Sequence, residues 1–353
     1  MYADDKKGRG QISATDLRES HYVKSGEGMA VRGGHLVCRT VAQVGRIPRK
    51  GALVPRGGSL LFSKGRGRIV STFLFWNTGR RPIADIVAKA AHTFQVDVLM
   101  LAECAVPGVE LLSILNAESS DYQLTFSAND EIKVLTKFGA EFLHPTAEGD
   151  RYSVRRLRLP GQQEILLAIA HLPSGLFFGP ESRSLECVEL ARLIIDEEKR
   201  AGHDRTVLVG DFNLNPFETG VVAASGLHAL MTRKLAARGS RVVQQKRYPI
   251  FYNPMWKFFG ESGTRPSGTY FYERAEHVVY FWNIFDQVLL RPSLISGFKD
   301  GDLRIIDAVG PIRLTRPDGR PNPAVGADHL PILFAVDVPL EGDHADRPTQ
   351  PMA

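Results

Sequence analysis

The sequence predicts a domain of the α+β class, built from short buried strands and a few helices. Runs of about four to eight apolar or β-branched residues that end in turn residues are typical of buried strands. Such runs recur from residue 69 to residue 338, whereas apolar residues at helical spacing occur in three places. With 353 residues, the chain is long enough to bury a substantial core.

The expected strands are spread over most of the chain after residue 68. They are 69–76, 96–101, 122–126, 132–138, 154–159, 165–170, 207–210, 283–290 and 332–338. One helix is expected to begin at Pro82, because proline is tolerated in a first helical turn, and two more are expected over 109–115 and 182–200. Residues 241–285 are rich in aromatic side chains and interrupted by Pro and Gly, so part of this stretch is expected to be loop.

The charge of the chain is unevenly distributed. Residues 1–70 contain 14 Lys and Arg against 5 Asp and Glu, whereas residues 71–353 contain 30 against 34. The net charge of +5 therefore comes from the N-terminal segment. Residues 1–68 are rich in Gly and lack periodicity, which predicts a disordered leader. This leader is either a basic arm for nucleic acid or another anionic partner, an over-extended start, or expression-derived sequence. A folded domain over 69–340 and a polar tail over 341–353 complete the expected organisation.

Cysteine usage and hydropathy favour a cytoplasmic protein. Cys38, Cys104 and Cys187 are scattered, odd in number and without metal-site spacing, which predicts a reducing compartment and no disulfides. No apolar stretch is long enough to span a bilayer, and the first thirty residues contain no apolar region of a secretory signal.

The stretch VLVGDFNLN, residues 207–215, contains the first candidate site residues. An apolar run ends at Gly210, and Asp211 and Asn213 follow it. Side chains alternate along a strand, so Asp211 and Asn213 are expected to leave the same face. A carboxylate beside an amide is suited to activating a water and holding a phosphoryl oxygen. The alternative is an ordinary Asx turn, which Gly-Asp-x-Asn also forms.

Polar residues recur at the ends of several other expected strands. If the strands form two packed sheets, these ends converge on one side, where a rigid scaffold can hold a metal and a substrate. Carboxylates with an amide, and no Cys or His cluster, favour Mg²⁺ or Mn²⁺ over zinc. The reaction implied is phosphoryl-group hydrolysis. The full set is Asn77, Glu103, His171, Asp211 with Asn213, Asp286, and Asp328 with His329.

The motifs around these residues resemble a known superfamily. In chain order they are FWN (75–77), LAE (101–103), AHL (170–172), GDFN (210–213), FDQ (285–287) and ADHL (327–330). Together they resemble the endonuclease/exonuclease/phosphatase superfamily, which includes deoxyribonuclease I, apurinic-site endonucleases, neutral sphingomyelinases and inositol-polyphosphate 5-phosphatases. The resemblance covers roughly 69–338 and implies a four-layer α/β/β/α sandwich of two mainly antiparallel sheets with helices outside.

The resemblance also implies a role for each matched residue. Glu103 would be the principal metal ligand, and Asp328 would assist at the metal or its waters. Asn77 would lie near the metal and the scissile phosphate, would help to order both, and is a further candidate metal ligand. Asp211 would orient and deprotonate the attacking water, and Asn213 would hold that water or a phosphoryl oxygen.

Three further roles are implied near the phosphate. His329 would donate to a phosphoryl oxygen, Asp286 would orient His329, and His171 would contact the phosphate or help the leaving oxygen depart. A turn cap is the alternative for Asp286, because FDQVLL departs from the usual hydrophobic-Asp-aromatic pattern. A structural histidine is the alternative for His171, and a surface carboxylate for Glu103. Ala102 stands where the family usually has Gln, so a contact behind the metal ligand is expected to differ.

The aromatic stretch bears on the substrate. Tyr, Phe and Trp between 248 and 272 are interleaved with Lys and Arg, which could stack unpaired bases while cations hold phosphates. Alternatively, Phe251, Trp256, Phe258 and Phe259 could enter a membrane interface, or the stretch could be buried in an extra subdomain. We therefore expect a Mg²⁺-dependent nuclease for DNA or RNA. The alternatives are a phosphatase or phosphodiesterase for a phospholipid, inositol phosphate or nucleotide, and a non-catalytic binding protein. The sequence names no protein partner.

Overall fold

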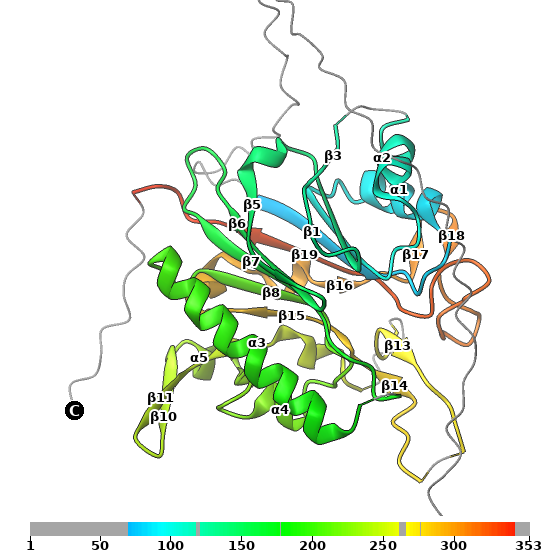
Figure 1. The fold of residues 1–353 in the computed structure, drawn as a ribbon. Helices are drawn as coiled ribbons and strands as arrows, with labels where there is room; N and C mark the ends of the chain where they lie inside the picture. The colour runs from blue at the N-terminus through cyan, green and yellow to red at the C-terminus, as the bar shows by residue number, and fades with distance from the viewer. Residues whose placement is uncertain (1–69, 118–120, 177, 261–265, 276, 343–353) are drawn as a thin grey trace, which may run out of the picture. The chain divides into compact units, whose positions relative to one another are not determined.

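Two large β-sheets form the centre of the fold (Figure 1). The structure is a computed structural model that describes residues 70–117, 121–176, 178–260, 266–275 and 277–342. The expected leader and residues 343–353 of the expected tail lie outside the described residues. Within them, sheet A contains, in spatial order, β16 (Arg304–Ile305), β19 (Ile332–Asp337), β1 (Val70–Asn77), β2 (Val98–Ala102), β4 (Ile132–Thr136) and β3 (Gln123–Leu124). Sheet B contains β5 (Leu143–Gly149), β6 (Tyr152–Leu157), β7 (Ile165–His171), β8 (Thr206–Asp211), β15 (Asp286–Leu290), β12 (Phe251–Tyr252) and β9 (Ala229–Leu230).

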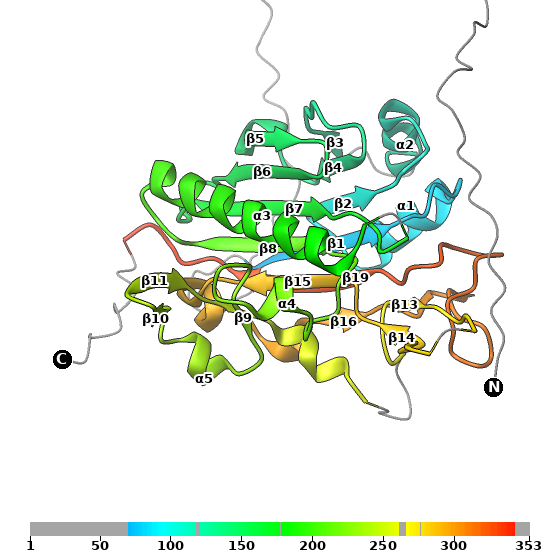
Figure 2. The same ribbon diagram turned by 60° about the horizontal axis from the view of Figure 1, so that its bottom comes forward.

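Helices cover the outer faces of the two sheets (Figure 2). The helices α1 (Ala84–Thr93) and α2 (Gly108–Leu115) lie beside sheet A, and the long α3 (Pro180–Ala201) lies across sheet B. Two short helices, α4 (Thr219–Val222) and α5 (Arg233–Ala236), follow β8. In the part of the chain that is described, no helix is both long and apolar enough to cross a membrane.

The alternation of side chains along β8 explains why sheet B is covered on both faces. Val207 and Val209 belong to the core that includes sheet A, whereas Leu208 packs with Cys187 and Ile194 of α3. An apolar run without polar alternation is the pattern of a strand buried on both faces. Most neighbouring strands are antiparallel, and the parallel pairs are β1–β2, β7–β8 and β12–β9. The α+β class and the four-layer α/β/β/α sandwich are confirmed.

Three strand predictions need correction. The strand β5 was not predicted from the sequence, because this sheet-edge strand has no continuous apolar run and its pairing with β6 is irregular between Pro145 and Ala147. The strand expected over 122–126 is reduced to β3. The strand expected over 283–290 is two strands in different sheets, since β14 (Trp282–Asn283) pairs with β13 (Tyr270–Phe271) and β15 joins sheet B.

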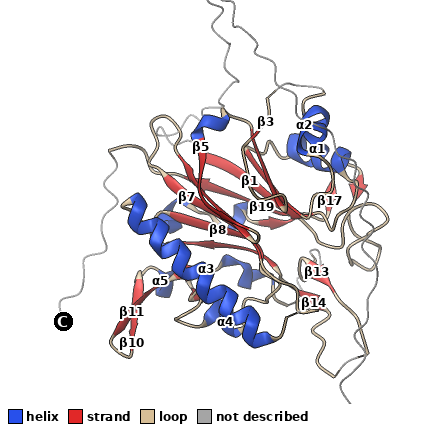
Figure 3. Cartoon of the chain, in the orientation of Figure 1, coloured by secondary structure: helices blue, strands red, loops and turns tan. Residues whose placement is uncertain are grey.

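The remaining elements are small (Figure 3). Two further hairpins are formed by β10 (Ser240–Val243) with β11 (Lys246–Pro249) and by β17 (Ala308–Val309) with β18 (Ile312–Arg313). Single 3₁₀ turns are η1 (Ala140–Phe142), η2 (Pro254–Phe258), η3 (Pro292–Gly297) and η4 (Asp300–Asp302).

Gly210 precedes the site at the end of β8, where the neighbouring strand comes very close. A Cβ atom built on Gly210 would lie 1.9 Å from the backbone oxygen of Ala170 on β7. Because backbone atoms cannot move aside cheaply, we expect Gly210→Ala to lower the free energy of unfolding by about 3 kcal/mol. Urea denaturation measures the change. Gly301→Ala is the control, since nothing lies within 4 Å of its Cβ position, and it should be close to neutral. A similar small effect at both positions would contradict the steric explanation.

Candidate active site

Strand register brings three predicted site residues to one edge of sheet B. His171 and Asp211 end β7 and β8, and Asp286 begins β15. His171 is the register partner of Asp211, which is in turn the partner of Asp286. Asp211 has the same parity along β8 as the core residues Val207 and Val209, and register partners face the same side of a sheet. All three side chains therefore project toward sheet A.

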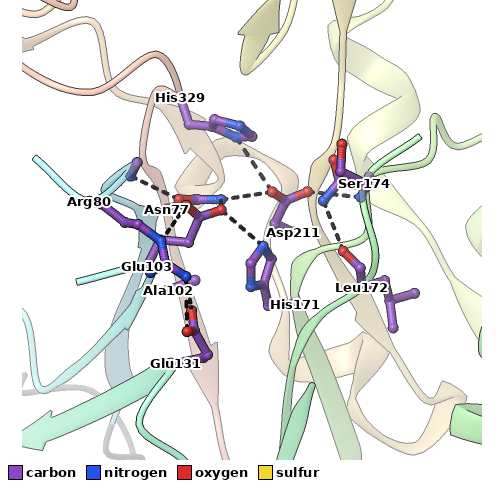
Figure 4. A network of polar contacts seen from close by, with 12 residues as sticks. Asn77, Arg80, Ala102, Glu103, Glu131, His171, Leu172, Ser174, Asp211 and His329 are labelled. Carbon is purple, nitrogen blue, oxygen red and sulfur yellow. Dashed lines mark hydrogen bonds and ion pairs between the residues drawn. The ribbon is translucent and has the colours of Figure 1, made fainter. Parts of the chain in front are cut away.

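Sheet A contributes Asn77, the last residue of β1, and Glu103, which follows β2. The Asn77 amide Nδ2 donates to Asp211 Oδ2 at 2.9 Å and to Glu103 Oε1 at 3.3 Å (Figure 4). Its Oδ1 accepts from the Gly79 N–H at 3.0 Å, which fixes the orientation of the amide. Glu103 has a left-handed backbone with φ of 48°, and the Thr78 hydroxyl holds its carbonyl oxygen. Such strain is concentrated at functional sites.

His329 lies against two carboxylates of sheet B. Its Nδ1 is 2.8 Å from Asp286 Oδ2 and 3.8 Å from Asp211 Oδ2. The backbone oxygen of His329 accepts from Trp76 Nε1 at 2.9 Å, and the Tyr270 ring packs 4.6 Å from the imidazole. Burial alone would disfavour the imidazolium, but the Asp286 and Asp211 carboxylates outweigh it and raise the pKa of His329 to about 10. His329 is therefore a cation at neutral pH.

His171 and Glu103 form a second contact between the sheets. The His171 Nε2 is 3.2 Å from Glu103 Oε1. The hydrogen bond from His171 lowers the pKa of Glu103 to about 2, so Glu103 is an anion at neutral pH. Burial opposes the charged form of His171, but the Glu103 hydrogen bond and the Asp211 charge prevail and raise its pKa.

Asn213 differs from the prediction for a continuing strand. The strand β8 ends at Asp211, and Asn213 has a left-handed backbone with φ of 50°, so strand alternation does not place its side chain. The Asn213 N–H donates to Asp211 Oδ1 at 2.8 Å, which is the Asx turn that the sequence left open. The Asn213 amide donates to the Leu172 carbonyl at 2.9 Å. Asn213 nevertheless faces the same cleft as Asp211.

These residues line a cleft of about 830 Å³. Asp328 is an exposed residue on its wall, and Gly79 allows this close approach, because a Cβ there would lie 2.6 Å from Asp328 Oδ1. The structure thus brings eight predicted residues to one cleft or to the network beneath it, and Asp286 and Asn77 belong to the network.

The cations of the cleft were not predicted from the sequence, and neither was Tyr280. Arg183 Nη1 donates to the Asn213 carbonyl at 2.6 Å, and Arg274 lies 5.4 Å above the Tyr272 ring. The cations occur in loops or on helix α3, outside any strand-end motif, so their position follows from tertiary structure alone. They are Arg80, Arg151, Arg183 and Arg274.

The aromatic stretch is divided between the core and the cleft. Phe251 and Phe258 are buried, with 0% and 4% of their surface exposed, so neither can enter a membrane interface as one alternative required. Trp256 and Phe259 pack on each other, with ring centroids 5.6 Å apart. Aromatic residues that do reach the cleft are Tyr270, Tyr272, Tyr280 and Phe285.

The donor set suits a hard divalent cation. Glu103 is ionised and 26% exposed, and Asp328 is exposed on the same cleft. Two carboxylates with room for water and phosphate oxygens are what Mg²⁺ requires. Ligand atoms of Asp211, Asp286 and His329 also lie within 4.8 Å of one another. In this group His329 Nδ1 is already engaged by Asp286 Oδ2 at 2.8 Å, so we interpret it as a hydrogen-bonded cluster beside the cleft.

The charge of His329 predicts how stability depends on pH. The folded pKa of about 10 lies above the ordinary value of 6.5, so the ion pair stabilises the fold fully below pH 6.5 and loses its contribution as the pH rises through 10. We expect the free energy of unfolding to fall between these two pH values. Asp286→Asn should flatten this dependence, because it removes the main anionic partner. Parallel stability curves for the two proteins would contradict the assignment.

Comparisons with known proteins give structural likenesses only. No family model matches the chain, and no curated protein matches its sequence. The chain is similar to truncated Caenorhabditis elegans TDP2, with 14% identity over 76% of this chain and 98% of that chain and a TM-score of 0.47. The chain is also similar to D. rerio TDP2 complexed with single-strand DNA product. The identity is 15% over 76% of this chain and 99% of that chain, and the TM-score is 0.47. A third similar structure is an endonuclease/exonuclease/phosphatase family protein from Leptotrichia buccalis. The identity is 14% over 76% of this chain and 99% of that chain, and the TM-score is 0.44. The name of the Leptotrichia buccalis protein is that of the superfamily that the motifs resemble.

Proposed function

We propose that the chain is a divalent-metal-dependent phosphodiesterase whose substrate is nucleic acid. The observation that supports this proposal is the polar network at the cleft. The Asn77 amide donates to both Glu103 and Asp211. Asp211 Oδ2 lies 3.8 Å from His329 Nδ1, which also contacts Asp286. The network combines an ionised carboxylate for a metal, a second carboxylate for a water, and a cation for a phosphoryl oxygen.

The proposed reaction is attack of water on phosphorus. Asp211 would orient the water and accept its proton, and its Oδ2 is held in place by the Asn77 amide. His329 would donate to a phosphoryl oxygen through Nε2, since its Nδ1 is engaged by Asp286. His171 and Asn213 face the same cleft, where His171 would contact the phosphate and Asn213 would hold the water or a phosphoryl oxygen.

Glu103 and Asp328 are the proposed ligands of a Mg²⁺ ion, with Mn²⁺ as the alternative. Such an ion would act as a Lewis acid on the phosphoryl oxygens. Asn77, which the sequence also suggested as a ligand, directs its amide donor toward both carboxylates while Oδ1 accepts from Gly79. We therefore assign Asn77 the role of ordering Glu103 and Asp211.

Nucleic acid is the favoured substrate class because aromatic rings and cations meet at the cleft. The Tyr270 ring lies 5.3 Å from Phe285 and 6.5 Å from Tyr272, with interplanar angles of 24° and 23°. Arg274 lies above the Tyr272 ring. A row of rings with cations beside it is suited to stacking bases while holding a phosphate backbone.

A second candidate is a phospholipid, inositol phosphate or nucleotide phosphoesterase. Large apolar residues are exposed at the cleft, with Leu176 61% and Val278 71% exposed. An apolar rim would suit the acyl chains of a lipid substrate.

The experiment is a substrate panel with the purified full chain. Plasmid DNA, single-stranded DNA, RNA, phospholipid vesicles, inositol phosphates and nucleotides are each incubated with Mg²⁺, with Mn²⁺ and with EDTA. We expect cleavage of nucleic acid that EDTA abolishes and that His329→Gln lacks. Phosphate release from lipid or small substrates without nucleic-acid cleavage would favour the second candidate. Activity in EDTA, or equal activity of His329→Gln, would reject the site itself.

The wider organisation is part of the same proposal. We propose residues 69–340 as the catalytic domain and a reducing, cytoplasmic location, which the two described cysteines support because Cys104 and Cys187 are both buried and unpaired.

A further inference from the structure

A charged surface lies at the opposite end of sheet B from the cleft. It consists of helix α5 and the β10–β11 hairpin, residues 233–249, which we call the basic ribbon. The strand β11 leads into β12, where Tyr252 pairs with Leu290, four residues along β15 from Asp286. In Figure 1 the hairpin projects away from the two large sheets.

The basic ribbon contains several cations and no acidic residue, and Arg233 of α5 pairs with Asp300, which lies outside the ribbon. Residues 219–260 contain no Asp or Glu. Some exposed cations elsewhere on the described surface pair with a carboxylate, among them Arg192, Arg313 and Arg320. In the ribbon, five exposed cations have no carboxylate partner among the described residues, and these are Lys234, Arg238, Arg241, Lys246 and Arg247.

The hairpin turn is strained and polar. Gln244 and Gln245 form its two-residue loop, and both have left-handed backbones with φ of 47° and 65°. Loops of this type strongly prefer Asn-Gly, because a left-handed backbone is costly for larger residues. Both glutamines are exposed, so no burial offsets the cost. Strain of this kind is a reason to look for a function of the tip.

Both faces of the ribbon present cations. Arg241 pairs with Tyr248 across the hairpin, and Lys246, two pairs closer to the turn, lies on the same face with its Nζ 5.2 Å from the Tyr248 ring. Arg247 lies on the other face opposite Val242. A binding partner that contacts all of these cations therefore needs negative charge on both sides of the hairpin.

We propose that the basic ribbon binds duplex DNA, with the hairpin in the major groove. The major groove of B-form DNA admits a two-stranded β-ribbon and has phosphates along both walls, which matches cations on both faces. The amides of Gln244 and Gln245 at the tip are groups that hydrogen-bond base edges. The deep and narrow major groove of A-form RNA excludes such a ribbon.

Two other anionic partners fit the ribbon less well. Single strands are bound on exposed aromatic platforms, whereas the one aromatic side chain of the hairpin, Tyr248, lies against Lys246. A membrane-inserting hairpin needs an apolar tip, whereas this tip is Gln244-Gln245 followed by Lys246 and Arg247.

The experiment measures binding of the full chain to short fluorescent nucleic acids in EDTA, by anisotropy at several salt concentrations. The test variant is Arg241→Gln/Lys246→Gln/Arg247→Gln. The control is Arg158→Gln/Arg192→Gln/Arg313→Gln, which removes the same charge from ion-paired surface sites. Because each lost phosphate contact lowers the salt slope by about 0.9, we expect the test variant to bind DNA duplex at least roughly tenfold more weakly, with a slope smaller by about 2 to 3. The control should behave like wild type.

The inference fails if the test variant and wild type bind duplex DNA equally, or if the control loses as much affinity. It also fails if wild type binds RNA duplex, single strands or phosphatidylserine vesicles through these three cations as tightly as DNA duplex. Hydrolysis of bis(p-nitrophenyl) phosphate, a substrate too small to reach the ribbon, should be equal in wild type and the test variant. That activity tests the proposed function separately, so either idea can fail without the other.

Discussion

Replacing Asp211 with asparagine is expected to lower turnover by roughly 10³-fold while the protein remains folded. Asparagine has the size of aspartate, so the buried position at the end of β8 stays filled. It lacks the negative charge that would accept a proton from water and that faces His329 at 3.8 Å. Steady-state kinetics with the substrate identified by the panel, together with thermal unfolding, measure the two effects.

The matched control for this substitution is Asp196→Asn on α3. Asp196 is an exposed residue whose carboxylate pairs with Lys199, far from the polar network. It should leave turnover unchanged. If Asp211→Asn retained most of the wild-type turnover, Asp211 would have no place in the reaction.

Replacing Glu103 with glutamine is expected to raise the Mg²⁺ concentration needed for half-maximal activity by at least about 100-fold. Loss of a direct ligand should cost more affinity for the ion than loss of a contact that supports a ligand. Glutamine keeps the length of the side chain but removes the anion that the His171 hydrogen bond stabilises. Titration of activity with Mg²⁺ and calorimetric binding of Mg²⁺ alone measure the effect.

Glu131→Gln is the control for Glu103→Gln. Both carboxylates face Arg80, but Glu131 contacts neither Asn77 nor His171 in the described network. An unchanged Mg²⁺ titration for Glu103→Gln, or an equal change for Glu131→Gln, would remove Glu103 from the ligand set.

The sequence predicted the strands and helices whose surroundings are uniform. Residues of β7 and β8 are apolar on both faces because α3 covers one face and sheet A the other. The strand β5 could not be predicted in this way, since it lies at the edge of sheet B and only Leu143 of its seven residues is buried. The pattern of apolar residues along a sequence indicates which side chains are buried, and few side chains of an edge strand are buried.

The strand ends of the candidate site were predictable because register follows from the sheets. His171, Asp211 and Asp286 each stand at the end of an apolar run, so placing the runs side by side brings the polar residues together. The position of Asn213 depends on a left-handed turn, and that of Arg183 on the packing of α3. No periodic pattern encodes either of them.

The contacts of the site also determine at which stage of folding it can form. Asn77 with Asp211, Glu103 with His171 and the His329 region with Asp286 each join a residue from the sheet A side to one from sheet B. Neither sheet contains a working set of groups by itself. During refolding, catalytic competence should therefore appear only when the two sheets dock and their apolar faces become dry, after most secondary structure has formed. The rate at which activity returns would thus measure the rate of the last step of folding.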